Sequence, residues 1–325
     1  MNLVADVGGT KTVFASVSGE PGGILLSSVK RYENAEFVSF KDALDAYIQE
    51  VSFGPVQTLV VAAAGIVAGN ICQLTNINWT VDGPALEADG HIGRVFIIND
   101  LMAAAYGVNC LGEDSLETVH SGIPQEDANQ IVVSPGTGLG ESIIHFVDGN
   151  PVPIAGEGGH VDFAPFDGLT HRLWEYTRRL RPRVSVEDIL SGPGLFAIYS
   201  FLAYEAAGEI DEAIILSAHP GGIIVDRGLG ASDPLAVKTL EVFLDVLAAE
   251  AGNVALKVLP AGGVFIGGGI IPRLLPILDC ERFARLFADK GAHRKILEAY
   301  PIHIIIDTEA PLYGAGEFAL SRING

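Results

Sequence analysis

The chain has 325 residues, a length that predicts two domains, because a single hydrophobic core rarely serves more than about 250–300 residues. Hydrophobic residues make up 49% of the chain and charged residues 18%, which is typical of a well-buried globular protein and excludes extensive disorder. The formal net charge of −20 excludes nucleic-acid binding, because an acidic surface repels phosphate backbones.

Apolar runs and one helical pattern alternate along the first hundred residues. Five β-rich runs predict strands at 2–5, 12–17, 24–30, 58–63 and 94–98. Apolar residues at helical spacing predict a helix between the third and fourth strands: Phe40, Leu44, Tyr47 and Val51. A second helix is expected to begin at Asp100 and to include Val108.

The rest of the chain continues this alternation. Strands are predicted at 130–133, 142–147, 264–267 and 303–306, and helices at 170–180, 186–190, 193–207, 235–258 and 311–323. Asp233 and Pro234 predict the start of the longest helix, with Asp as its cap and Pro at its first position. We expect residues 1–110 and 311–325 to form a small α/β domain and residues 111–310 a large one, with a hinge near 109–112 and another before Pro311.

Two strand–glycine-turn–strand units are the most informative motifs. The first contains Asp6-Val7-Gly8-Gly9-Thr10, and the second contains Gly136-Thr137-Gly138-Leu139-Gly140. Turns without side chains leave backbone N–H groups open to an anion, and a threonine adds a hydroxyl donor. Neither turn matches the Walker or dinucleotide fingerprints, and each alone also fits an ordinary glycine hairpin. Facing each other across a cleft, the two would hold a polyphosphate, which favours a phosphate-transfer enzyme.

Asn99 and Asp100 follow directly after a predicted strand. Ligands of α/β sheets bind at this carboxyl edge, so both residues are candidate site residues. Asp100 also fits the role of N-cap for the helix that follows, and the two roles are compatible.

Three further segments carry candidate residues. Glu157 and His160, on a glycine-rich loop, fit metal binding, acid–base chemistry or hydrogen bonding to a polyol, and equally a solvated loop. Glu187 belongs to an acidic pair at an expected helix start, where the helix dipole alone favours it. The run Gly267-Gly268-Gly269 after a strand allows close approach of an adenine or ribose, or of a tightly packed helix.

Taken in order, these motifs resemble the bacterial glucokinases of the hexokinase/actin-like ATPase superfamily. The resemblance covers the whole chain and includes two more segments, Leu190-Ser191-Gly192-Pro193-Gly194-Leu195 and Gly262-Gly263-Val264-Phe265-Ile266. Lys11 stands where many relatives carry Asn. The related ROK sugar kinases carry a cysteine-rich zinc motif, which three scattered cysteines do not form, so the resemblance is to the non-ROK type.

The resemblance implies an α/β, two-domain actin-like ATPase fold (a ribonuclease H-like duplication) with a central cleft that binds glucose, ATP and Mg²⁺. It implies that Asp100 is the general base toward the sugar 6-hydroxyl, and that the other hydroxyls are bound by Asn99, Glu157, His160 and Glu187. The phosphates are assigned to Gly8, Gly9, Thr10, Thr137 and Gly138, and the adenosine to Gly267, Gly268 and Gly269. Asp6 is expected to face Mg²⁺ through water.

The expected activity is therefore ATP-dependent phosphorylation of D-glucose, with closure of the two domains around the sugar. A kinase for another hexose, such as mannose or an amino sugar, is the first alternative, and a non-catalytic actin-like nucleotide or sugar sensor is the second. A cytoplasmic location is expected, since cysteine usage fits a reducing compartment and neither a signal peptide nor a membrane-spanning run is recognised. A homodimer is expected as well.

Overall fold

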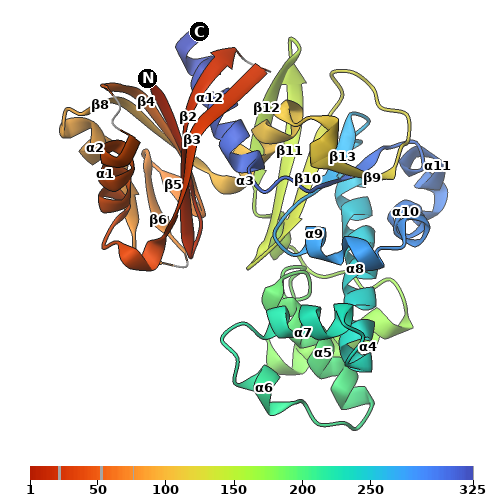
Figure 1. Cartoon of the computed structure of the whole chain (residues 1–325). Coiled ribbons are helices and arrows are strands. Elements are labelled where there is room, and N and C mark those ends of the chain that lie inside the picture. Colours follow the sequence, from red (N-terminus) through yellow and green to blue (C-terminus); the bar gives the residue numbers. More distant parts are fainter. Residues whose placement is uncertain (21–22, 52–53, 76, 325) are drawn as a thin grey trace. The chain divides into compact units, whose positions relative to one another are not determined.

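The computed structural model describes residues 1–20, 23–51, 54–75 and 77–324 (Figure 1). It consists of two compact units. The first contains Met1–Ser115, Asn150–Ala155 and Asp307–Gly325, and the second contains Leu116–Gly149 and Gly156–Ile306.

The first unit is built on a five-stranded sheet of order β3-β2-β1-β4-β8. Its strands are β1 (Asn2–Val7), β2 (Lys11–Glu20), β3 (Gly23–Glu33), β4 (Val56–Ala63) and β8 (Ile92–Asn99). β1, β4 and β8 run parallel, and their registers pair Val7 with Ala63 and Ala63 with Asn99. The first glycine turn and Asp100 therefore emerge at the same edge of this sheet.

Helices pack on both faces of that sheet because its central strands are apolar on both sides. One face, with Leu3 and Leu59, packs against α1 (Phe40–Val51). The other, with Val4 and Val60, packs against α3 (Asp100–Gly107) and α12 (Ala310–Asn324). The unit also holds a three-stranded sheet, β5 (Gly65–Ala68), β6 (Ile71–Leu74) and β7 (Thr80–Asp82), followed by α2 (Gly83–Ala88).

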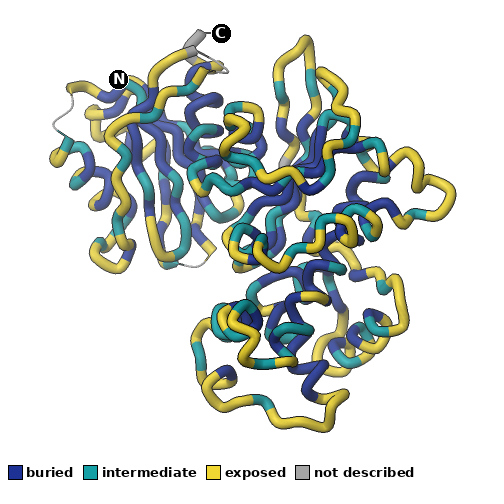
Figure 2. Tube along the Cα trace, turned by 45° about the vertical axis from the view of Figure 1, so that its right-hand side comes forward, coloured by how far each residue is buried: buried dark blue, intermediate teal, exposed yellow. Residues whose placement is uncertain are grey.

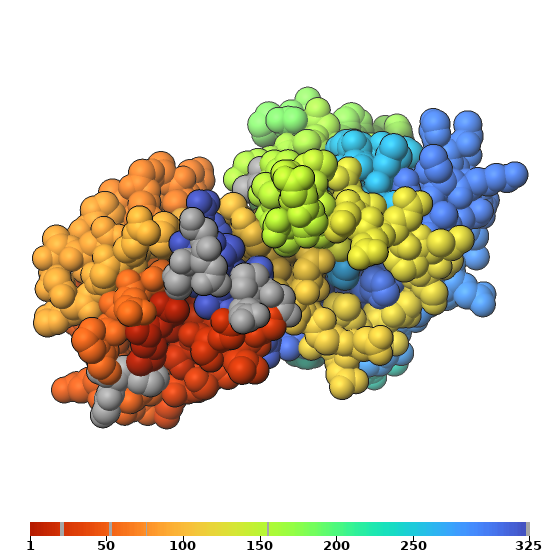
Figure 3. Space-filling model, turned by 90° about the horizontal axis from the view of Figure 1, so that it is seen from above, coloured from red at the N-terminus to blue at the C-terminus, as the bar shows by residue number. Residues whose placement is uncertain are grey.

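The second unit is built on five strands in the order β11-β10-β13-β14-β9. They are β9 (Leu116–His120), β10 (Gln130–Pro135), β11 (Leu139–Val147), β13 (Gly263–Ile266) and β14 (Ile302–Ile305). The strand that follows β11 in the chain, β12 (Asn150–Gly156), belongs to the first unit except for Gly156. β10 forms an antiparallel hairpin with β11 and runs parallel to β13, as β1 does with β2 and β4. The two sheets thus repeat one topology. The exposed turn of residues 147–150 between β11 and β12 reaches the surface, yellow-green in Figure 3.

Helix α8 (Pro234–Val258) is the central helix of the second unit. Asp233 caps it by accepting the N–H groups of Leu235 and Ala236, as its sequence predicts. Most of its residues are buried. Figure 2 colours buried segments dark blue and exposed ones yellow. The helices that contact it are α5 (Gly192–Glu205), α7 (Pro220–Leu229), α10 (Cys280–Ala288) and α11 (Arg294–Leu297). The unit also contains α4 (Gly168–Leu180), which packs on α5, α6 (Glu212–Ile215), which packs on α7, and α9 (Ile271–Leu274).

The prediction of a helix at residues 186–190 is wrong. Only a single turn forms there, with the Ile189 and Leu190 N–H groups both donating to the Val186 carbonyl. The turn cannot lengthen because Ser191 leaves the helical conformation to cap α5. Glu187 therefore lies on a turn and not at a helix start. Several elements were not anticipated by the periodicity: β5, β6, β7, β9, β12, α7 and α10.

Candidate functional site

The first glycine turn joins β1 to β2 and is held by a residue far away in sequence. The Gly8 N–H donates to the Lys11 carbonyl at 3.0 Å, which closes the turn. Asn34 supports it from outside, since its side-chain Nδ2 donates to the Gly8 carbonyl at 2.9 Å and its backbone N–H to the Thr10 carbonyl at 2.8 Å. Lys11 forms an exposed ion pair with Glu33. Asn34 was missed by sequence reasoning because no local motif marks it.

Asn99 and Asp100 lie at the junction of β8 and α3. The N-cap of α3 is Asn99 and not Asp100: its Oδ1 accepts from Leu101 at 2.9 Å and from Met102 at 3.4 Å. Asn99 Nδ2 also donates to the Gly65 carbonyl at 3.2 Å. The Asp100 Oδ1 accepts from the same Leu101 N–H at 2.9 Å. Both side chains are thereby held in place by the helix start.

Asp6 is the second carboxylate near this edge of the first sheet. It lies one residue before the end of β1, and Asp100 lies one residue after the end of β8. Burial, and then the negative charge of Asp100, raises the pKa of Asp6 to about 7. Two carboxylates that repel each other in this way favour a cation between or beside them.

The second glycine turn joins β10 to β11 and is bonded to the segment that carries Glu187. The Gly136 N–H donates to the Gly138 carbonyl at 2.7 Å, and the Gly192 N–H donates to the Gly136 carbonyl at 2.8 Å. Glu187 Oε2 accepts the Leu139 N–H at 2.8 Å. A Cβ on Gly138 would approach this Oε2 to 2.5 Å, so only glycine fits there without movement of Glu187.

Glu157, His160 and Glu187 form one cluster in the second unit. His160 Nδ1 lies 3.7 Å from Glu157 Oε2, and His160 Nε2 lies 3.8 Å from Glu187 Oε1. The side chains of Glu157 and His160 are 78% and 63% exposed, and that of Glu187 is 32% exposed. The cluster is accessible to a ligand and offers two carboxylates and an imidazole, which suits a polyhydroxylated molecule.

A ladder of backbone hydrogen bonds aligns the two segments of this cluster. The Glu187 N–H donates to the Gly159 carbonyl at 2.9 Å, and the Val186 N–H donates to the Val161 carbonyl at 3.0 Å. The ladder ends where the Phe163 N–H donates to the Val184 carbonyl at 3.0 Å. Glu187 is therefore brought beside His160 by strand-like pairing and not by a helix.

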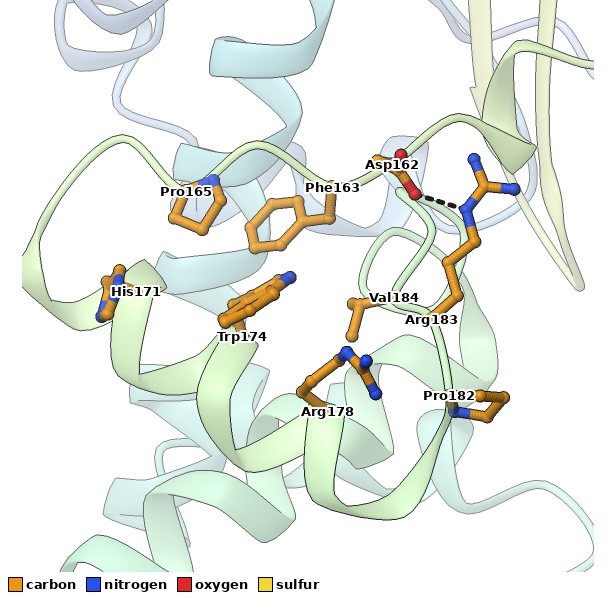
Figure 4. Close-up of a pocket in the computed structure, with 9 residues that line it drawn as sticks. All are labelled: Asp162, Phe163, Pro165, His171, Trp174, Arg178, Pro182, Arg183 and Val184. Carbon is orange, nitrogen blue, oxygen red and sulfur yellow. Dashed lines mark hydrogen bonds and ion pairs between the residues drawn. The ribbon is translucent and has the colours of Figure 1, made fainter.

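Beyond this ladder lies a groove of about 680 Å³. Figure 4 shows Trp174 and Arg178 projecting from α4 toward it, while Arg183 turns to an ion pair with Asp162. The residues that line it are Asp162, Phe163, Pro165, His171, Trp174, Arg178, Pro182, Arg183 and Val184. This lining includes none of the expected sugar- or phosphate-binding residues.

The run Gly267–Gly269 follows β13 and packs against the end of β10. The Gly267 N–H donates to the Val133 carbonyl at 2.9 Å. Gly268 has a φ of +85°, and a Cβ there would collide with the Pro135 carbonyl. Gly269 is exposed with open space around it. The run thus brings bare backbone to the base of the second glycine turn.

Among the described residues, no group of three or more His, Cys, Asp or Glu side chains is placed to hold a metal ion. The Asp6 carboxylate, with the charge of Asp100 nearby, nevertheless fits the expected Mg²⁺ site, because Mg²⁺ is commonly held by one or two carboxylates together with substrate phosphates. No helix in the described part of the chain is long and apolar enough to cross a membrane.

Comparison with known proteins identifies the family. The model of the family described as Glucokinase matches residues 3–322. The chain belongs to the glucokinase family. It is 33% identical to a glucokinase of Nostoc punctiforme, covering 96% of this chain and 97% of that protein. It is 34% identical to a glucokinase of Helicobacter pylori, covering 97% of this chain and 94% of that protein.

Solved structures agree with this family assignment. A glucokinase from an Antarctic psychrotroph superposes with a TM-score of 0.86 at 28% identity, covering 99% of this chain and 98% of that one. A ROK family glucokinase from Streptomyces griseus, in complex with glucose and AMPPNP, has a TM-score of 0.64 at 23% identity, over 98% of each chain, and shows only the shared fold. The expected fold class, a two-domain actin-like α/β kinase fold, is confirmed, and this member of the glucokinase family is an enzyme.

Proposed function

We propose that this chain transfers the γ-phosphoryl group of ATP to the 6-hydroxyl of D-glucose, giving glucose 6-phosphate and ADP. One observation in the second unit carries the proposal beyond family membership. Glu187 accepts the Leu139 N–H of the glycine turn with one oxygen and lies 3.8 Å from His160 with the other. A single carboxylate thus links the second glycine turn, proposed to bind phosphate, to the cluster proposed to bind the sugar.

Glu157, His160 and Glu187 bind and orient the sugar in this proposal. Sugar hydroxyls donate to carboxylate oxygens and exchange hydrogen bonds with an imidazole, and charged acceptors make the stronger bonds. The Asn99 side chain donates from Nδ2 to the Gly65 carbonyl and accepts at Oδ1 from the Leu101 N–H at the start of α3. In this proposal its amide group also forms a hydrogen bond with another sugar hydroxyl. Orientation matters because phosphoryl transfer depends mainly on alignment and charge stabilisation.

Asp100 is the proposed general base. Its Oδ1 is fixed by the Leu101 N–H, which holds the carboxylate at the edge of the first sheet. Asp100 takes the proton of the sugar 6-hydroxyl as that oxygen attacks the γ-phosphorus. The new O–P bond forms while the bond between the γ-phosphorus and the β–γ bridging oxygen breaks, and ADP leaves with the electron pair.

The glycine turns are proposed to bind the phosphates through backbone N–H groups, with hydroxyl donors from Thr10 and Thr137. Gly267, Gly268 and Gly269 are proposed to border the adenosine. Asp6 is proposed to face Mg²⁺, which when bound neutralises phosphate charge. Bulk positive charge is not available in a chain with a net charge of −20, so these local donors must serve.

A coupled assay of ADP formation over a small hexose panel tests the proposal. We expect glucose to have the highest kcat/KM, with mannose and glucosamine well below it. A higher value for another hexose would replace glucose as the substrate, and no ADP formation with any hexose would favour a non-catalytic sensor.

A homodimer in the cytoplasm also remains a prediction, and a monomeric mass in light scattering would contradict the dimer.

A further inference from the structure

A buried carboxylate lies behind the loop that carries Glu157 and His160. Glu141 is the third residue of β11, which begins at Leu139 directly after the second glycine turn, and it is only 8% exposed. Its Oε1 is fully buried and has no hydrogen-bond partner among the described residues. An unpaired buried carboxyl oxygen is costly, so this position calls for an explanation beyond packing.

Glu141 supports the backbone of that loop directly. A Cβ on Gly158 would collide with Glu141 Oε2, and would lie 2.7 Å from its Cδ and 3.0 Å from its Cβ. The Glu141 carboxyl therefore occupies the space that a side chain at 158 would need. Gly158 follows Glu157 and begins the 3₁₀ turn Gly158–His160. We therefore expect a shift of this carboxyl to move both candidate sugar-binding side chains.

The charged groups that face Glu141 come from α8. Burial, followed by the charge of Glu250, raises the pKa of Glu141 to about 7, and Lys257 opposes that rise. Glu250 is itself 5% exposed, and burial raises its pKa as well. Glu250 Oε2 accepts from Asn253 Nδ2 at 2.9 Å. Lys290, next to α10, donates to Asn253 Oδ1 at 2.7 Å and adds a positive charge near Glu250.

We propose that Glu141 is a positioning residue whose uncharged carboxyl holds the sugar loop at Gly158, so that loss of its proton weakens glucose binding. The ionised group faces a carboxylate on α8, and no donor among the described residues reaches its Oε1. Displacement of the ionised carboxylate lowers its energy, and this displacement shifts Gly158, which lies against the carboxyl group. This inference rests on the proposed function, because it assigns glucose to the cluster of Glu157 and His160.

The test compares wild type with Glu141→Gln, which keeps the size of the side chain but cannot ionise. Glucose Kd is measured by calorimetry without nucleotide, and glucose KM at saturating ATP, between pH 6 and pH 9. We expect the wild-type Kd to rise about tenfold over this range, which corresponds to a Glu141 pKa about one unit higher in the sugar complex. The glucose Kd of Glu141→Gln should rise much less over the same pH range. The ATP KM should change with pH to the same extent in both proteins.

Two further variants make the result specific. Glu250→Gln removes the neighbouring charge that opposes ionisation, so the rise in glucose Kd should move to lower pH. Glu175→Gln changes an exposed glutamate on α4 and should reproduce the wild-type profile. Should Glu141→Gln fail to fold, the shift in Glu250→Gln still decides the matter.

Equal pH profiles in wild type and Glu141→Gln would overturn the inference, as would an unshifted profile in Glu250→Gln. A uniform loss of affinity in Glu141→Gln at every pH, with the wild-type slope retained, would mean a purely structural role and also overturn it. Absence of glucose binding and phosphorylation by wild type at any pH would instead show that the proposed function is wrong, and the inference would fail with it.

Discussion

The two units use the same hairpin-and-parallel-strand topology but surround their glycine turns with different chemistry. In the first unit, the turn after β1 is held by Asn34, and two mutually repelling carboxylates, Asp6 and Asp100, flank the same sheet edge. In the second, the turn after β10 is held by Glu187, which also belongs to the cluster with His160. A repeated scaffold thus carries a pair of carboxylates at a sheet edge in one unit and a cluster of two carboxylates and an imidazole in the other. This division predicts that substitutions in the two units will affect different kinetic parameters.

The largest effect is expected from Asp100→Asn in the first unit. This nearly isosteric change removes the proposed base, so kcat should fall by roughly 10²–10⁴-fold, the usual contribution of general base catalysis. Glucose Kd should remain close to wild type, because the sugar cluster is in the second unit. Steady-state kinetics and calorimetry check both statements, and near wild-type turnover would refute the role of Asp100.

Substitution of Glu157 or His160 by Ala should mainly affect glucose. Each lost hydrogen bond costs about 1–3 kcal/mol, so glucose KM should rise roughly tenfold or more while ATP KM changes little. Glu175→Ala on exposed α4 is the matched control. If glucose KM is unchanged in both variants, the loop is structural and the contrast between the units fails.

Glu187→Ala sharpens the comparison because Glu187 contacts both elements of the second unit. Loss of its bond to the Leu139 N–H should loosen the glycine turn, and loss of the carboxylate should weaken the sugar cluster. We therefore expect ATP KM and glucose KM to rise together, each by roughly fivefold or more. A rise in glucose KM alone would show that the bond to the turn is dispensable.

The pH dependence of stability should distinguish wild type from Glu141→Gln. Glu141 ionises near its ordinary value of 4.5 in the unfolded chain but only at about 7 in the folded one. As the pH rises from 4.5 to 7, the unfolded state loses this proton first, so the free energy of unfolding falls, by up to about 3 kcal/mol. Urea titrations should show this decline in wild type and a shallower one in Glu141→Gln; parallel curves would contradict the raised pKa.

The smallest effect is expected from Asn34→Ala in the first unit. It removes two side-chain hydrogen bonds, one that Asn34 donates to the Gly8 carbonyl and one that it accepts from the Thr12 hydroxyl. ATP KM should therefore rise a few-fold, and the free energy of unfolding should fall by about 1–2 kcal/mol. Lys11→Ala breaks only an exposed ion pair and should change neither by much. If Asn34→Ala and Lys11→Ala change ATP KM and stability equally, the Asn34 side chain has no special role in supporting the first glycine turn.

Sequence patterns identified the features that depend on neighbouring residues. The glycine turns, the strand that ends at Asn99 and the capped start of α8 all follow from short-range rules, and the structure contains them. The roles of the proposed site residues remain predictions, but the structure brings Glu157, His160 and Glu187 together from segments about thirty residues apart.

The features that sequence patterns missed depend on contacts between distant segments. Asn34 supports a turn about 25 residues before it, and Glu141 supports Gly158 from a neighbouring strand. The false helix at 186–190 has the same origin, because pairing with residues 159–163 keeps that segment extended up to its single turn. Asn99 replaces Asp100 as the cap because its side chain reaches both the Leu101 and Met102 N–H groups.

With the roles proposed above, the two contacts of Glu187, to the Leu139 N–H and to His160, would limit how this enzyme can acquire a different sugar preference. A substitution at Glu187 that suits another hexose would also disturb the glycine turn, so any gain in acceptor choice would carry a loss in nucleotide use. Glu157 and His160 have no such second attachment in their hydrogen bonds and ion pairs, as far as the described residues show. Laboratory evolution toward new hexoses should therefore accumulate changes at these two positions first and keep Glu187 unchanged.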